Sequence, residues 1–133
     1  MSALTVTAQE TKKPAAAAEA KDGVKHVDPE GAKKLIDESA AKKDGKVVVL
    51  DVRTPEEYKA THIEGAVNID FHDDNFAGEV AKLDKSKTYI VHCQGGGRSS
   101  RSLETLTTLG FKSIVHLDGG ISGWQKAKLP VVK

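Results

Sequence analysis

This chain of 133 residues is poor in several features that would define a protein class. It has one cysteine, so its fold cannot depend on an internal disulfide. No apolar run exceeds five residues, whereas a membrane-spanning helix needs about 20. Twenty basic and nineteen acidic side chains give a net charge of +1, which argues against a general nucleic-acid binder and leaves no sign of a membrane partner.

The first 25 residues differ in composition from the rest of the chain. They are rich in Ala, Thr and Lys and show no face that could be buried, which predicts a disordered tail or linker over residues 1–25 and one domain over residues 26–133. They also lack a basic start followed by an apolar stretch. We therefore expect a cytoplasmic protein, or a periplasmic one if a signal peptide has already been removed.

Short valine- and isoleucine-rich runs alternate with helical patterns along the domain. Strands are predicted at residues 46–53, 66–69, 88–92 and 113–117, and helices at residues 29–43, 55–60, 76–83, 99–109 and 122–126. This alternation is typical of an α/β fold with a central, mostly parallel sheet and helices on both faces. Ligands of such folds bind at the carboxyl ends of the strands.

The first predicted strand, at residues 46–53, ends in polar residues and leads into a helix start. Thr54 can cap that helix, Pro55 suits its first position, and Glu57 completes a capping box. Asp51 and Arg53, at the strand end, are candidates for lining a pocket. Arg53 is also four residues from Glu57, so we expect these two side chains to pair.

Cys93 directly follows the strand predicted at residues 88–92 and is followed by Gln94, three glycines and Arg98. Glycines can turn backbone N–H groups inward to form an anion site, and the helix predicted to start at Ser99 adds a positive dipole end. A helix N-terminus and a neighbouring cation both stabilise a thiolate. No acidic residue lies between Asp84 and Glu104, so we expect a positive field around a nucleophilic cysteine.

Four segments, in the same order along the chain, resemble those of rhodanese-domain proteins of the single-domain thiosulfate sulfurtransferase type. They are Leu50–Arg53 with Pro55–Tyr58, His62–Ala66 with Asn68–Ile69, Cys93–Ser99, and Asp118–Gly120 with Trp124 and Leu129–Val131. The sequence departs from the pattern at Gln94, where many relatives carry Arg, and at Thr61, where a Gly usually stands. Only one cation therefore lies in the loop after Cys93.

The resemblance implies a rhodanese-like fold and a sulfurtransferase mechanism. By this resemblance we expect Cys93 to take the sulfane sulfur of a donor such as thiosulfate as a persulfide, and a thiophilic acceptor, cyanide or a thiol, to remove it in a second half-reaction. The resemblance assigns substrate binding to Gln94, Gly95, Gly96, Gly97, Arg98 and Ser99. It implies no cofactor and no metal, and its partners are small-molecule donors and acceptors, with a protein sulfur acceptor as a further candidate.

Two other functions share parts of this pattern. Cysteine-based phosphatases and arsenate reductases also combine Cys, Gly and Arg at a helix start, but such phosphatases have five residues between Cys and Arg. Here there are four, and the smaller loop suits a sulfur atom better than a phosphate. The second alternative is a persulfide carrier that delivers sulfur to a partner protein.

The remaining histidines and the tryptophan are assigned structural roles. The five histidines and one cysteine lack the spacing of zinc ligands. His92 should face away from Cys93, because neighbouring side chains alternate along a strand. We expect His62 and His116 to pack or form hydrogen bonds, and Trp124 to fill the core.

Overall fold

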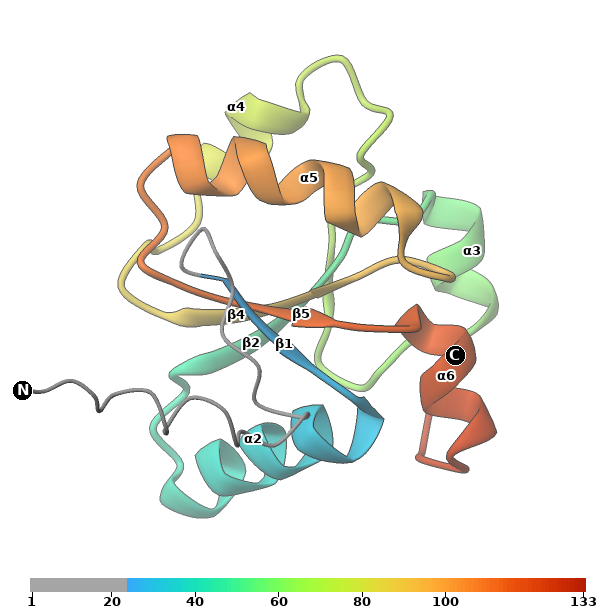
Figure 1. Cartoon of the computed structure of the whole chain (residues 1–133). Helices are drawn as coiled ribbons and strands as arrows, with labels where there is room; N and C mark the ends of the chain where they lie inside the picture. Colours follow the sequence, from blue (N-terminus) through green and yellow to red (C-terminus); the bar gives the residue numbers. More distant parts are fainter. Residues whose placement is uncertain (1–23) are drawn as a thin grey trace, which may run out of the picture.

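A computed structural model describes residues 24–133, which fold around five parallel strands (Figure 1). The strands are β1 (Val24–Val27), β2 (Val47–Asp51), β3 (Val67–Asn68), β4 (Thr88–His92) and β5 (Ser113–Leu117). Their order in the sheet is β1-β5-β4-β2-β3. The helices are α2 (Pro29–Lys42), α3 (Pro55–Ala60), α4 (Phe76–Ala81), α5 (Gly97–Thr108) and α6 (Gly120–Lys126). The predicted α/β fold with a parallel sheet is confirmed.

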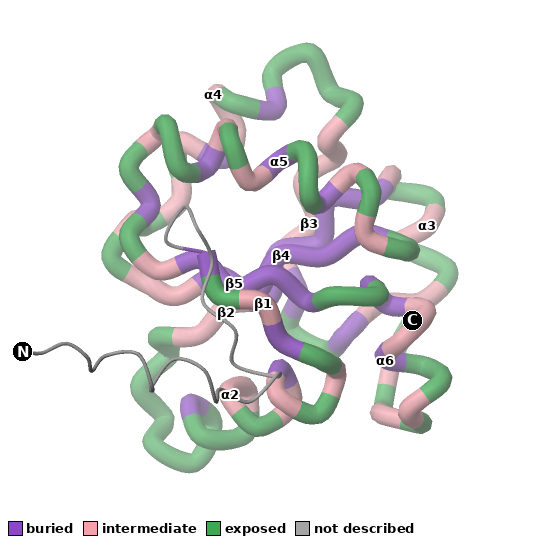
Figure 2. Tube along the Cα trace, in the orientation of Figure 1, coloured by how far each residue is buried: buried purple, intermediate pink, exposed green. Residues whose placement is uncertain are grey.

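Helices cover the sheet on both sides, as Figure 1 shows. On one face α4 and α5 pack against Leu50, Tyr89, Val91 and Ile114. On the other face, α2, α3 and α6 pack against core residues that alternate with the first set along the strands, namely Val27, Val49, Ile90, Val115 and Leu117. Figure 2 shows that β2, β4 and β5 are buried along much of their length. Because both faces of these strands are covered, neighbouring positions are both apolar, as at residues 49–50, 90–91 and 114–115.

Capping side chains fix where α2 and α3 begin. The Asp28 side chain accepts a hydrogen bond from the backbone N–H of Gly31 at 2.8 Å. The predicted capping box of α3 is present: Thr54 accepts from the Glu57 N–H at 3.2 Å, and the Glu57 carboxylate accepts from the Thr54 N–H at 3.0 Å. The start of α3 is therefore set locally by the sequence.

The start of the sheet differs from the sequence prediction. Residues 1–23 of the predicted tail lie outside the described residues, but Val24 and Lys25 belong to β1. This strand was not predicted, because a four-residue segment with only two apolar side chains gives little periodic signal. The strand forms because β1 pairs in parallel with β5 from Val24 to Val27, a contact that the local sequence does not reveal.

Among the helices that the structure describes, none has the length and apolar character needed to span a membrane.

Candidate active site

Cys93 lies at the carboxyl end of β4, buried under the first turn of α5. Its Sγ accepts a hydrogen bond from the backbone N–H of Gly96 at 3.0 Å and lies 3.4 Å from Ser99 Oγ. Burial raises the pKa of the thiol, but the Ser99 hydroxyl and backbone N–H groups at the helix start outweigh it, so the pKa is lowered. The local geometry therefore favours a thiolate.

Only one of the three consecutive glycines needs its conformational freedom. Gly96 has a φ of 120°, whereas Gly95 and Gly97 do not have positive φ. Gly96 is the residue before α5, so the positive φ lets the chain turn into the helix while the Gly96 N–H points at Sγ. The helix accordingly begins at Gly97, two residues before the predicted start at Ser99.

The start of α6 holds the loop from the other side. Ile121 and Ser122 donate their backbone N–H groups to the carbonyls of Cys93 and Gln94 at 3.0 and 3.1 Å. Gly120 has a φ of 61°, and a Cβ there would lie 2.6 Å from the Cys93 carbonyl oxygen. Gly120 is thus required for backbone to approach backbone behind the cysteine.

The two candidate pocket residues, Asp51 and Arg53, form a buried ion pair at 2.8 Å. Arg53 also donates to the Thr61 carbonyl at 2.6 Å and to Gln94 Oε1 at 3.3 Å, and Gln94 donates to Ser122 Oγ at 2.9 Å. Arg53 therefore connects α3, the loop after β4 and α6. The Gln94 side chain links Arg53 to Ser122 in this network. An arginine at this position would place a second positive charge next to Arg53.

Arg98 pairs with Glu57, which corrects the expected pair between Arg53 and Glu57. Both terminal nitrogens of Arg98 contact the Glu57 carboxylate, at 2.8 and 3.1 Å. These hydrogen bonds, which outweigh burial, lower the pKa of Glu57 from 4.5 to about 2. The acid-free interval around Cys93 suggested a positive field, but the fold brings in this carboxylate from α3, 41 residues earlier.

A polar chain extends from Cys93 through the interior to the surface. Ser99 Oγ lies 2.7 Å from His116 Nε2, and His116 Nδ1 lies 2.8 Å from Asp118 Oδ1. His26 Nδ1 contacts the same carboxylate oxygen at 2.8 Å. Three potential metal-ligating atoms thus gather within 4.8 Å, but hydrogen bonds between these atoms account for the grouping. This chain of contacts was not predicted from the sequence. The pattern that could have indicated it is a histidine followed two residues later by an aspartate, His116 and Asp118, at the end of β5.

Comparison with known proteins agrees with this geometry. Residues 29–127 match the family model of the rhodanese-like domain. The chain belongs to this family. The probable adenylyltransferase/sulfurtransferase MoeZ of Mycobacterium tuberculosis is 38% identical over 85 residues, covering 64% of this chain and 22% of that protein. Thiosulfate sulfurtransferase 16 of Arabidopsis thaliana is 36% identical over 91 residues, covering 61% and 76%.

Solved structures show the same fold. A rhodanese-related protein from Thermoplasma volcanium superimposes with a TM-score of 0.68 at 30% identity, covering 80% of this chain and 96% of that one. The present chain spans about a fifth of MoeZ and about three quarters of the Arabidopsis sulfurtransferase. What it shares with these named sulfurtransferases is therefore the rhodanese-like domain. In this chain the domain contains one buried cysteine, Cys93.

Trp124, His62 and His92, which were assigned structural roles, pack or form hydrogen bonds within this rhodanese-like domain. Trp124 is buried and donates its Nε1–H to the Pro130 carbonyl at 2.8 Å. His62 stacks on Tyr58, with ring centroids 3.8 Å apart. His92 Nδ1 lies 3.0 Å from the Cys93 carbonyl oxygen, and its buried Nε2 has no hydrogen-bond partner among the described residues.

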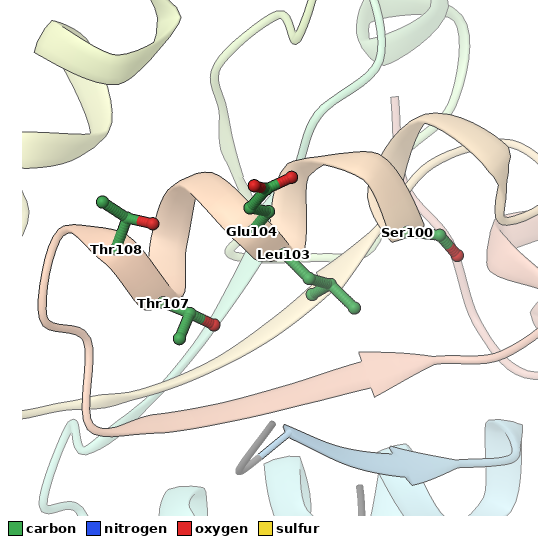
Figure 3. Close-up of a pocket in the computed structure, with 5 residues that line it drawn as sticks. All are labelled: Ser100, Leu103, Glu104, Thr107 and Thr108. Atoms are coloured by element: carbon green, nitrogen blue, oxygen red, sulfur yellow. The ribbon is translucent and has the colours of Figure 1, made fainter. Parts of the chain in front are cut away.

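A surface pocket of the rhodanese-like domain lies away from the cysteine loop. It is lined by Ser100, Leu103, Glu104, Thr107 and Thr108, all from α5 (Figure 3). None of the residues from Cys93 to Ser99 lines it. The pocket and the loop from Cys93 to Ser99 therefore share no lining residue among those that the structure describes.

Proposed function

We propose that this rhodanese-like domain is a sulfurtransferase that moves sulfane sulfur from a donor such as thiosulfate to cyanide or a thiol through a persulfide on Cys93. The observation that carries the proposal is the hydrogen bond from the Gly96 N–H to Sγ at 3.0 Å, at the start of α5. This donor and the helix dipole stabilise negative charge at the sulfur. The sulfurtransferase names of the relatives give the reaction class.

The first half-reaction uses the thiolate as nucleophile. Cys93 Sγ attacks the outer sulfur of thiosulfate, a new S–S bond forms, and the bond to the sulfite group breaks. Sulfite leaves with the electron pair of that bond, and the terminal sulfur of the persulfide carries the negative charge. In this mechanism the backbone N–H groups of the loop from Gln94 to Arg98 bind that charge, beginning with the Gly96 N–H that bonds to Sγ.

The second half-reaction returns the cysteine to its starting state. The acceptor attacks the terminal sulfur of the persulfide, the S–S bond breaks, and its electron pair remains on Cys93 as thiolate. Backbone donors suit both half-reactions, because they stay fixed while the charge moves by one sulfur atom. Binding of the anionic donor by Arg98 stays a prediction, since both terminal nitrogens of Arg98 contact Glu57.

The test is intact-protein mass after incubation with thiosulfate. The wild-type chain should gain one sulfur atom that a reductant removes, and Cys93→Ser should gain none and form no thiocyanate from thiosulfate and cyanide. Because the chain has one cysteine, the added mass is assigned without peptide mapping. Turnover retained in Cys93→Ser contradicts the proposal, and sulfur loading without turnover to small acceptors supports the carrier alternative.

A further inference from the structure

We propose that Ser99, His116 and Asp118 form a proton relay that carries the Cys93 thiol proton through the interior and holds the sulfur as a thiolate. The inference deepens the proposed function and rests on it, because the thiolate is the attacking group in sulfur transfer. Ser99 contacts the reacting sulfur, whereas His116 and Asp118 act through Ser99 and are positioning residues. Of the three relay residues, the sequence pattern assigned only Ser99 to substrate binding. His116 and Asp118 were not among the predicted site residues.

The relay is continuous from a buried atom to an exposed one. The steps are 3.4 Å from Sγ to Ser99 Oγ, 2.7 Å from Oγ to His116 Nε2, and 2.8 Å from Nδ1 to Asp118 Oδ1. Ser99 is fully buried and the His116 side chain is 3% exposed, whereas the Asp118 side chain is 55% exposed. A proton that leaves the sulfur along this path therefore reaches His116, whose other ring nitrogen is bonded to a carboxylate in contact with solvent.

The chemistry of the three groups fixes the direction of each hydrogen bond. An ionised carboxylate only accepts, so the Nδ1 that faces Asp118 carries the imidazole proton and Nε2 is an acceptor. The Ser99 hydroxyl has one proton, and its shortest contact is the one to Nε2 at 2.7 Å. Its oxygen is then free to accept the S–H of a Cys93 thiol.

Ionisation of the thiol reverses two of these bonds and breaks none. The sulfur proton passes to Ser99 Oγ as the Ser99 proton passes to His116 Nε2, so the products are a thiolate and an imidazolium. The Ser99 hydroxyl now donates to the thiolate, and Nε2–H donates to Ser99. Asp118 accepts from Nδ1 in both states, and its negative charge offsets the charge that His116 gains.

His116 is placed to accept a proton, because Nε2 faces Ser99 Oγ while Nδ1 faces the Asp118 carboxylate. Burial lowers the pKa of His116 and so keeps Nε2 unprotonated before the transfer, whereas the hydrogen bond to Asp118 raises the pKa and stabilises the imidazolium that the transfer produces. The titratable groups that face it are Asp118 next to it, His26 on β1 with ring centroids 5.2 Å apart, and Cys93 and His92 at the end of β4. His26 contacts the same oxygen of Asp118 at 2.8 Å, which helps to fix that carboxylate.

The experiment measures the ionisation of Cys93 directly, without a sulfur donor. The rate of alkylation by iodoacetamide is followed against pH for wild type, Ser99→Ala and His116→Gln, and the thiolate absorbance relative to Cys93→Ser gives a second measure. A hydrogen bond to a charged group is strong enough to move an ionisation by about one pH unit. We expect both variants to shift the midpoint upward by about that amount, with roughly tenfold less thiolate at pH 7. Asp118→Asn should shift it in the same direction.

The matched control is His62→Gln, which removes a partly buried imidazole that stacks on Tyr58 outside the relay. It should leave the Cys93 midpoint unchanged. A midpoint of His116→Gln that coincides with wild type overturns the relay, even if Ser99→Ala shifts, because Ser99 also bonds to Sγ directly. If His116→Gln does not fold, Asp118→Asn decides, because Asp118 is exposed and reaches the sulfur only through His116 and Ser99. Shifted midpoints in a chain that never takes up sulfur leave the relay standing and reject the proposed function instead.

Discussion

At the scale of single residues, the guanidinium of Arg98 serves two anionic groups. Its terminal nitrogens bind the Glu57 carboxylate at 2.8 and 3.1 Å, while its positive charge acts on the nearby Cys93. Arg98 lies in the first turn of α5, and Glu57 lies in the first turn of α3. The pair therefore fixes the loop around Cys93 to the helix that follows β2, in addition to its electrostatic effect on the sulfur.

This pair makes stability depend on pH in the acid range. The folded pKa of Glu57 is about 2, below its ordinary value of 4.5, so its contribution to the free energy of unfolding is fully present above pH 4.5. It is lost as the pH falls toward 2. In Glu57→Gln we expect a lower Tm at pH 7 and a smaller fall in Tm between pH 4.5 and pH 2.5, measured by thermal unfolding at each pH.

The chain offers a control for that measurement on the same turn of α3. Gln at position 57 can still complete the capping box, so the variant tests the charge rather than the cap. Glu56→Gln removes an exposed carboxylate from the same helix start and the same helix dipole. If the two variants show the same pH dependence, the effect comes from the dipole and not from Arg98.

At the scale of elements, two helix starts meet behind the cysteine. The first turn of α5 provides donors to Sγ, and the first turn of α6 provides donors to the carbonyls of Cys93 and Gln94. The loop is therefore bonded on its sulfur side and on its carbonyl side by backbone groups. Such a loop is rigid without depending on long side chains, which suits fixed donors around a charge that moves.

A prediction at this scale concerns Gly120, where α6 approaches the loop. Gly120→Ala places a Cβ 2.6 Å from the Cys93 carbonyl oxygen and imposes a side chain on a φ of 61°. The backbone conformation alone costs about 1–2 kcal/mol, so Tm should fall by at least about 5 °C. The matched control is Gly95→Ala, where nothing lies within 4 Å and φ is not positive. Equal Tm values for the two variants in calorimetry would contradict a close packing of Gly120 against the loop after Cys93.

The elements were predictable from sequence to the extent that their signals are local. The capping box of α3 and the apolar runs of β2 and β4 lie within a few residues, and the structure has them where they were predicted. The Glu57–Arg98 pair joins residues 41 apart, and the Ser99–His116 contact joins residues 17 apart. The periodicity of a sequence carries no information about such partners. The sequence therefore predicted the reactive cysteine, but not the long-range contacts of the residues around it.

At the scale of the whole molecule, the edge strand β1 lies outside the matched family region, which begins at Pro29. It nevertheless completes the domain. Val24 and Val27 are 2% and 5% exposed and belong to the two cores on opposite faces of the sheet. The same strand places His26 against Asp118. Stability and the polar chain from Cys93 therefore both depend on four residues that a domain boundary at Pro29 would omit.

Two truncations test this boundary. Removal of residues 1–22 keeps every described element and should leave the Tm unchanged. Removal of residues 1–28 deletes β1 and exposes the edge of β5. Loss of two buried valines costs roughly 3 kcal/mol or more, so the Tm should fall by at least about 10 °C.

The double variant Val24→Ala, Val27→Ala in the full chain is the control for these truncations. It should also lower the Tm, but by less, because it keeps the strand pairing. A large loss of Tm on removing residues 1–22 would place part of the stabilising contacts before β1, and an unchanged Tm on removing residues 1–28 would show that the sheet needs only its four remaining strands.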